Sequence, residues 1–249
     1  MYNFRKRLLS GEFLYGTGIT LASPEIPEML AKTGYDWLFI EAEHSPLDYK
    51  TMLTLLQASG KSCPGIIRIP DQQEVTIKKA LDIGAEGIII PQVNTAEQAE
   101  KILSFAKYPP MGVRGIGLAR ANMYGLAFEE AVKFTNEETA VIVQAEHKDV
   151  LDNINEIVKV EGIDAVFVGP YDLSSSFGKA GQVNDPEVVD AIDFIASVCK
   201  QGGVRLGIYG GSPAYLRPFK DKGFTMFVCG VDMSLLSEAA INNLNQLRE

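Results

Sequence analysis

Eight short runs of β-branched and aliphatic residues recur along the chain, and an amphipathic stretch of helical periodicity separates each run from the next. We predict strands at residues 13–20, 37–44, 65–70, 87–93, 140–146, 165–172, 205–210 and 226–232. Their nearly continuous apolar character is typical of parallel strands buried on both faces. Helical crossovers of this length force neighbouring strands to run parallel, and eight such units can close, whereas doubly wound sheets more often stop at about six strands. The pattern predicts an α/β fold, the (β/α)8 or TIM barrel.

The length of the chain agrees with this architecture. The 249 residues match the roughly 250 that are usual for such a barrel, so we expect one domain over residues 1–249. The one long irregular stretch lies at about 109–127, and its glycines and arginines indicate a functional or subunit-contact loop.

Charge and cysteine content exclude several classes of protein. The net charge of -9 argues against a nucleic-acid partner, and no apolar run approaches the ~18 residues that span a bilayer. The basic N-terminal cluster precedes only a short apolar patch, which is not typical of an export signal. Cys63, Cys199 and Cys229 form no CxxC pair, which argues against a disulfide framework and a thiolate zinc site. We therefore expect a cytoplasmic protein that binds neither nucleic acid nor membrane.

Polar residues interrupt the apolar runs where the predicted strands end, and in this kind of barrel the chemistry sits at the C-terminal ends of the strands. The interrupting residues are Glu41, Glu43 and His44 on the second strand, Arg68 on the third, Gln144 and Glu146 on the fifth, and Asp172 on the sixth. Four strands thus direct polar side chains to one rim.

Two of these acids predict a metal site. Gln144 and Glu146 are two residues apart and share one face of an extended strand, while Asp172 ends the neighbouring strand. Two carboxylates facing one point repel each other unless a hard divalent cation binds between them, which favours Mg²⁺, Mn²⁺ or Co²⁺. The alternative is that each acid caps the helix that follows it. The pairing of the two acids, together with nearby Arg68, favours the metal.

His44 is the candidate proton-transfer group of the rim, because its ordinary pKa near 6.5 suits it to exchange protons at neutral pH. The alternative is a structural histidine. Either Glu41 or Glu43 is placed to orient the imidazole once the chain turns out of the strand. The other histidine, His147, begins a polar helix start and is better explained by capping or exposure.

Arg68 interrupts the apolar run IIRIP, and a guanidinium buried there needs an anionic partner. That partner is either the carboxylate of a substrate or a structural acid. None of the eight predicted strands contains lysine, which argues against a Schiff-base enzyme and supports metal dependence.

Longer segments resemble one family over nearly the whole chain. They are WLFIEAEHSPLD, RIP with IKKALDIGAEGIIIPQVNTAEQA, YPPMGVRGIG, VQAE, VEGIDAVFVGPYDLSSSFGKAGQ with PEV, and VCGVD. In this combination and order they are similar to the HpcH/HpaI family of class II aldolases, which use a divalent metal to cleave or form 4-hydroxy-2-oxo acids from pyruvate and an aldehyde. The resemblance implies that Glu146 and Asp172 bind the metal, that Arg68 contacts the pyruvyl unit, and that His44 takes part in proton transfer.

The same resemblance carries expectations about the assembly. It implies that Gln144 lies beside the metal and that Asp82, in the LDIGA segment, reaches the active site of a neighbouring subunit. It also implies a homo-oligomer, usually a hexamer, in which three dimers each exchange a terminal helix.

Three positions depart from the family pattern. Glu41 stands where an Asp usually pairs with the catalytic histidine, and the extra methylene displaces that partner. Tyr171 stands where a small residue is common, and Tyr209 where an aliphatic one is common. We expect both tyrosines to contact the substrate and to narrow the pocket, which leaves the identity of the aldehyde open.

Three other functions remain alternatives to the aldolase. One is a related lyase acting on a CoA thioester, disfavoured by the lack of a basic nucleotide-binding segment. Another is a protein that binds a 2-oxo acid without catalysis, and a third is an isomerase that releases no aldehyde. Product analysis and alanine substitution of His44 or Arg68 separate them.

Overall fold

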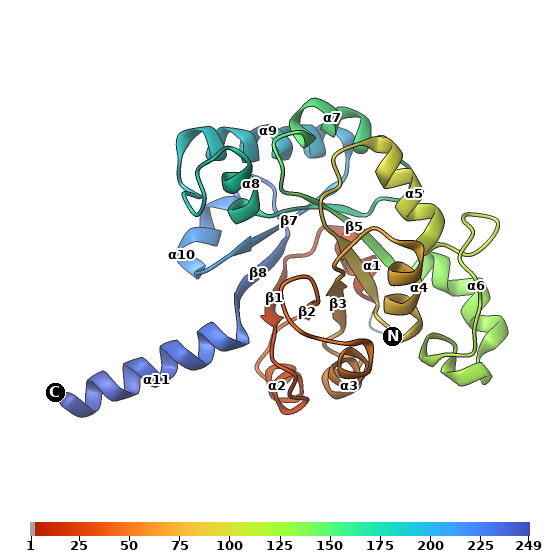
Figure 1. Ribbon diagram of the computed structural model, residues 1–249, viewed down its shortest axis with the longest axis horizontal. Coiled ribbons are helices and arrows are strands. Elements are labelled where there is room, and N and C mark those ends of the chain that lie inside the picture. The colour runs from red at the N-terminus through yellow and green to blue at the C-terminus, as the bar shows by residue number, and fades with distance from the viewer. Residues whose placement is uncertain (1–2) are drawn as a thin grey trace.

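The computed structural model describes residues 3–249, and its eight strands form one closed parallel barrel in chain order (Figure 1). Pairing of the last strand with the first completes the cylinder. The strands are β1 Leu14–Ile19, β2 Trp37–Glu41, β3 Gly65–Arg68, β4 Gly87–Ile90, β5 Ala140–Ala145, β6 Ala165–Val168, β7 Arg205–Gly210 and β8 Met226–Val231. The predicted (β/α)8 barrel is confirmed.

Several strands end earlier than predicted, and the differences fall at the rim. β2 stops at Glu41, so His44 lies in the loop beyond it. β6 stops at Val168, because Pro170 cannot donate to a strand ladder and instead occupies the first turn of a helix. The prediction of strand up to residue 172 was therefore wrong, and Asp172 lies in the first turn of that helix.

Most of the helices surround the barrel and bury apolar side chains against the outer side of the strands (Figure 1). The helices of the described chain are α1 Phe4–Ser10, α2 Glu25–Leu30, α3 Tyr49–Ser59, α4 Glu74–Asp82, α5 Ala96–Ala106, α6 Phe128–Glu138, α7 Val150–Ile157, α8 Pro170–Ser176, α9 Pro186–Gly202, α10 Pro213–Leu216 and α11 Asp232–Arg248. Two 3-10 segments, η1 Arg120–Gly125 and η2 Arg217–Lys220, complete the set. Within residues 3–249, no helix is both long and apolar enough to cross a membrane.

Helix α1 closes the N-terminal end of the barrel. Phe4 and Leu8 are fully buried in the interior cluster, and the Phe4 ring lies 5.6 Å from that of Trp37. An ion pair of 2.8 Å between Arg5 and Asp164 fixes the helix to the turn before β6. Because this end is filled, the accessible interior lies toward the C-terminal ends of the strands.

Helix α11 does not pack along the barrel but extends away from it (Figure 1). Leu236, Ile241 and Leu247 on this helix are exposed. Exposed apolar surface of this extent on a helix is typical of a surface that contacts another molecule.

Candidate functional site

Seven of the predicted site residues line a cavity of about 730 Å³ at the C-terminal end of the barrel. Those that line it are Glu41, His44, Arg68, Gln144, Tyr171, Asp172 and Tyr209. They lie at or just after the C-terminal ends of β2, β3, β5, β6 and β7. This is the location expected for the active site of such a barrel.

Strand alternation explains why these side chains point inward. Gln144 lies two residues after Ile142, and Tyr209 two residues after Gly207, so each continues the inward face of its strand toward the rim. Glu41 and Arg68 are paired in register between β2 and β3. The register of the two strands therefore places their side chains next to each other.

Glu146 lies one residue beyond β5 and is almost completely buried. Its Oε1 accepts a hydrogen bond of 2.8 Å from the Gln92 main-chain N–H, and its Oε2 accepts one from the Gln144 side-chain amide. Burial, together with the nearby carboxylates of Glu43 and Asp172, raises the pKa of Glu146 to about 7 despite the Gln92 hydrogen bond. A carboxyl that holds its proton near neutral pH has too little positive charge nearby to stabilise its ionised form.

The donor set around Glu146 fits a hard divalent cation. Asp172 supplies a second carboxylate, and the Gln144 Oε1 atom is buried without a hydrogen-bond partner among residues 3–249. A Cβ atom on Gly169 would lie 3.1 Å from Glu146 Oε2, so the glycine keeps the space beside this oxygen open. In the described part of the chain no three His, Cys, Asp or Glu side chains are placed to hold a metal ion by themselves. Two carboxylates and one amide oxygen suit an ion that keeps positions for water and substrate.

Arg68 is held by two acids and still lines the cavity. Its Nε donates to Glu41 Oε2 at 2.7 Å and lies 3.3 Å from Glu43 Oε2, and its guanidinium carbon lies 5.3 Å from the centre of the Phe39 ring. Sequence reasoning left a structural acid and a substrate carboxylate open as partners. Structural acids are present, and a guanidinium with five donors retains N–H groups for a ligand.

His44 lies at the mouth of the cavity, and 63% of its side chain is exposed. Its Nε2 atom is 3.9 Å from Glu43 Oε2. Glu41 instead accepts the main-chain N–H groups of Glu43 and His44 at 2.7 and 2.9 Å, which shapes the turn after β2. Of the two acids considered for orienting the imidazole, Glu43 is therefore the one that approaches the ring. Burial raises the pKa of Glu43, while the Arg68 charge opposes the rise.

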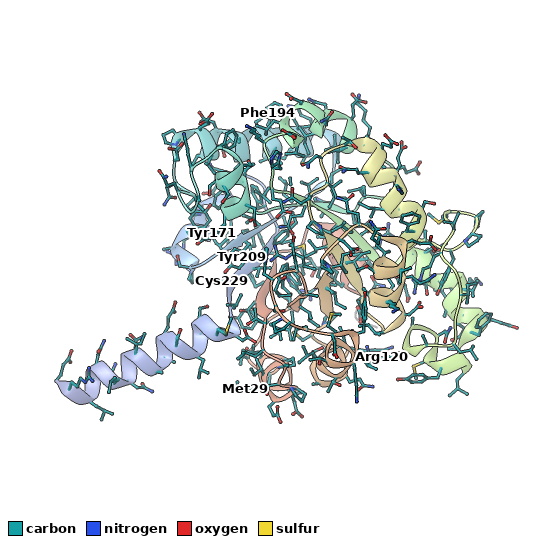
Figure 2. All side chains as sticks on the ribbon, viewed as in Figure 1. Met29, Arg120, Tyr171, Phe194, Tyr209 and Cys229 are labelled. Carbon is teal, nitrogen blue, oxygen red and sulfur yellow. The ribbon has the colours of Figure 1, made fainter. Side chains whose placement is uncertain are left out.

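Tyr171 and Tyr209 face each other across the side of the cavity formed by α8 and β7 (Figure 2). Their ring centres are 5.9 Å apart, and the planes meet at 62°, an edge-to-face contact. Burial raises the pKa of the Tyr209 hydroxyl.

Asp82 lies apart from this cavity within its own chain. It ends α4, which leads to the N-terminal end of β4, and its Oδ1 accepts a hydrogen bond of 2.7 Å from Arg114 Nη2. Its expected service to a neighbouring subunit stays a prediction.

Two contributors to the site were missed from the sequence. Gln92 follows the apolar run of β4 at the same rim, so the polarity change there was a usable signal for its role beside Glu146. Gly169 carries no polar group, and its close approach to Glu146 depends on how β6 and α8 join.

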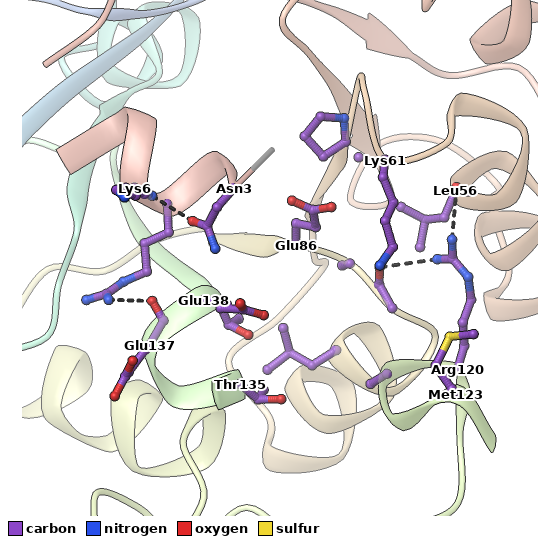
Figure 3. Close-up of a pocket in the computed structure, with 18 of the residues that line it drawn as sticks. Asn3, Lys6, Leu56, Lys61, Glu86, Arg120, Met123, Thr135, Glu137 and Glu138 are labelled. Carbon is purple, nitrogen blue, oxygen red and sulfur yellow. Dashed lines mark hydrogen bonds between the residues drawn. The ribbon is translucent and has the colours of Figure 1, made fainter. Parts of the chain in front are cut away.

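A second cavity, of about 600 Å³, lies at the opposite end of the barrel beside α1 (Figure 3). Several cations line it, and its walls include residues from the ends of α3, α4 and α6. Arg120 donates to the carbonyls of Leu56, Ile83 and Gly84. Cations at helix C-termini stabilise unpaired carbonyls, so Arg120 has a structural role in this lining.

The chain is similar to known proteins over almost its entire length. A family model described as HpcH/HpaI aldolase/citrate lyase matches residues 15–239. A hydroxypyruvate/pyruvate aldolase of Chromohalobacter salexigens is 37% identical over 246 residues, covering 98% of this chain and 96% of the relative. A 5-keto-4-deoxy-D-glucarate aldolase of Klebsiella pneumoniae is 35% identical over 238 residues, covering 95% and 93%. An HpcH/HpaI aldolase/citrate lyase family protein from Burkholderia cenocepacia has a crystal structure with a TM-score of 0.95 at 32% identity, covering 98% of both chains.

Proposed function

Because the chain belongs to the HpcH/HpaI aldolase/citrate lyase family, and is thereby a carbon–carbon lyase of the aldolase type, we propose that it uses a divalent metal to cleave and form 4-hydroxy-2-oxo acids. The two halves of the substrate are a 2-oxo acid, pyruvate or hydroxypyruvate as in the names of its relatives, and an aldehyde. The observation that carries the proposal is the Glu146 carboxyl, whose pKa is raised by burial and by the nearby Glu43 and Asp172 carboxylates. It accepts a hydrogen bond from Gln144, a residue that lines the same cavity as Arg68 and Asp172.

Glu146 and Asp172 are the residues that would hold the cation, with Gln144 Oε1 beside them. Mg²⁺, Mn²⁺ and Co²⁺ all accept such oxygen ligands. When bound, the ion supplies Lewis acidity that polarises the ketone of the 2-oxo acid. A positive charge there also removes the reason for Glu146 to hold a proton.

Arg68 binds the anionic end of the 2-oxo acid and offsets negative charge that develops on its oxygen. Glu41 and Glu43 fix the guanidinium in one orientation, so little side-chain freedom is lost when the substrate binds.

His44 takes the proton from the 4-hydroxyl in cleavage and returns it to the aldehyde oxygen in synthesis. Its exposure at the mouth lets it exchange that proton with water. Glu43, whose Oε2 lies 3.9 Å from His44 Nε2, is the acid placed to orient the imidazole.

The proposal is tested by exchange of the pyruvate methyl protons with deuterium, followed by NMR, because this readout needs no knowledge of the aldehyde. We expect exchange with Mg²⁺, Mn²⁺ or Co²⁺, loss of exchange on adding chelator, and loss in Asp172→Asn. Asp190→Asn, an exposed site on α9, is the matched control. Absence of exchange with all three metals would overturn the aldolase assignment, and binding of pyruvate without exchange would favour a non-catalytic protein.

We also propose the assembly and location that family membership suggests. The protein acts in the cytoplasm as a hexamer of three dimers, with Asp82 of each subunit serving a neighbouring active site. The exposed apolar side chains of α11 support this arrangement, as does the absence of Asp82 from the lining of its own subunit's cavity.

A further inference from the structure

We infer that the aldehyde partner of this enzyme carries an extended apolar or aromatic substituent with at most one polar end, and that this substituent lies against Tyr171 and Tyr209. The inference rests on the proposed aldolase function and names the substrate class of the same site. It follows from the size of the cavity, the chemistry of its walls and the hydrogen bonds already made by its polar lining.

The cavity is larger than a three-carbon 2-oxo acid requires. Its volume of about 730 Å³ falls within the roughly 300–1,000 Å³ of pockets that enclose drug-sized ligands. Arg68, Gln144 and Asp172 account for one side of the lining. The remaining space is available to the second substrate.

Two aromatic pairs line that space. Phe39 and Phe167 stack deep in the barrel with ring centres 5.9 Å apart, and Tyr171 and Tyr209 form the edge-to-face pair nearer the opening (Figure 2). Apolar side chains complete the wall; they are Leu21, Leu47, Pro46, Pro170, Val231 and Met233. An aromatic guest gains contact with the faces and edges of these rings beyond the area it buries.

Several polar groups in the lining already have partners within the protein. The Thr20 hydroxyl donates to Asp232 at 2.5 Å, and the Ser45 hydroxyl donates to the Glu41 carbonyl. The Glu41 carboxylate binds Arg68 and two main-chain N–H groups, and the Gln144 amide binds Glu146. A polyhydroxylated aldehyde would therefore bury hydroxyls without partners, each at about 1–3 kcal/mol. The tyrosine hydroxyls can satisfy a single polar end.

The reaction itself is balanced by the two substrates. The pyruvate methyl carbon loses one proton and forms the new bond to the aldehyde carbonyl carbon, while the aldehyde oxygen gains one proton. The substituent on the aldehyde takes no part in the bonds that change, so it affects the rate through binding and orientation.

The test compares kcat/KM for four aldehydes with pyruvate and saturating Mn²⁺: benzaldehyde, hexanal, glyceraldehyde and erythrose. We expect benzaldehyde and hexanal to exceed the two hydroxylated aldehydes by at least about tenfold. Tyr171→Ser, at a residue that is 43% exposed and whose loss leaves the core intact, should reduce this ratio severalfold. Phe194→Ser removes an equally exposed aromatic side chain from α9, outside the cavity, and should leave the ratio unchanged.

Equal rates for the four aldehydes, or preference for the hydroxylated pair, would overturn the inference while the aldolase function stands. An unchanged ratio in Tyr171→Ser would also overturn it, because the selectivity would then arise elsewhere. The two proposals are separated by deuterium exchange into pyruvate alone, which reports the enolate chemistry and involves no aldehyde.

Discussion

At the scale of single residues, the site places acidic side chains close together where a ligand is expected. Glu146 is buried near Glu43 and Asp172, and the one hydrogen bond it receives from the main chain does not offset burial. Positions of this kind are common at functional sites, because a binding partner recovers the stability that the empty site lacks.

Replacing this carboxyl with an amide gives a prediction about stability. The pKa of Glu146 is raised from its ordinary 4.5 to about 7, so its contribution to folding is complete below pH 4.5 and is lost as the pH rises through 7. With chelator present, the free energy of unfolding of Glu146→Gln should therefore be about 3 kcal/mol higher than that of the wild type at pH 8. The difference should vanish toward pH 4.5. Urea denaturation at several pH values measures it. A difference independent of pH would contradict the prediction, and Glu129→Gln on exposed α6 is the control.

Spacing in the sequence was enough to place Gln144 and Glu146 on one face, because strand alternation is a local property. It was not enough to separate Glu41 from Glu43 as the neighbour of His44. That choice depends on the turn after β2, where the Glu41 carboxylate binds main-chain N–H groups and so turns away from the imidazole.

At the scale of elements, the junction of β6 and α8 sets the geometry of the site. Gly169 joins them, and Pro170 starts the helix that carries Asp172. The apolar run up to residue 172 resembled a strand, but a proline near its end was the local sign of a helix start.

This junction predicts the effect of one added methyl group. In Gly169→Ala the Cβ would lie 3.0 Å from Gln144 Nε2 and 3.1 Å from Glu146 Oε2, closer than side chains normally approach. We expect kcat/KM to fall by about tenfold to a hundredfold through misplacement of the carboxylate, with a loss of stability of about 1–3 kcal/mol. Steady-state kinetics and urea denaturation measure the two effects. Gly117→Ala, whose Cβ meets nothing within 4 Å, is the control, and full activity in Gly169→Ala would show that the contact is tolerated.

Helix α1 predicts a second effect at this scale. Phe4 is fully buried against Trp37 in the barrel interior, so Phe4→Ala should lower the free energy of unfolding by about 3 kcal/mol or more. Leu9→Ala on the same helix removes a side chain that is 40% exposed and should have a much smaller effect. Equal losses in the two variants, measured by urea denaturation, would mean that α1 does not close the barrel in solution.

At the scale of the whole molecule, the periodic pattern predicted the barrel because each βα unit repeats the same local signals. The direction in which α11 leaves the barrel was not predicted by this repeating pattern. The apolar residues of α11 are spread along the helix without the strong amphipathic pattern of the helices that cover the barrel, so the sequence did not indicate that it would extend away from the strands.

The exposed face of α11 leads to a prediction about assembly. Full-length protein should run at several times the chain mass of 27.2 kDa in size-exclusion chromatography with light scattering. The double variant Leu236→Asp and Ile241→Asp should shift it to smaller species, because buried charges oppose apolar contact between subunits. The variant Asn242→Asp and Gln246→Glu adds the same charge to the opposite side of the same helix and is the control. An unchanged mass in the leucine and isoleucine variant would place the subunit contacts elsewhere.

The closure of the barrel by α1 has a kinetic consequence. Because α1 fills that end, reactants enter and leave through the rim where His44 and Tyr171 lie. The first molecule to enter therefore has access to the carboxylates and Arg68. An aldehyde seated against the tyrosines lies in the path of a later 2-oxo acid. Synthesis should therefore follow a compulsory order, with the 2-oxo acid binding before the aldehyde, and cleavage should release the aldehyde before the 2-oxo acid.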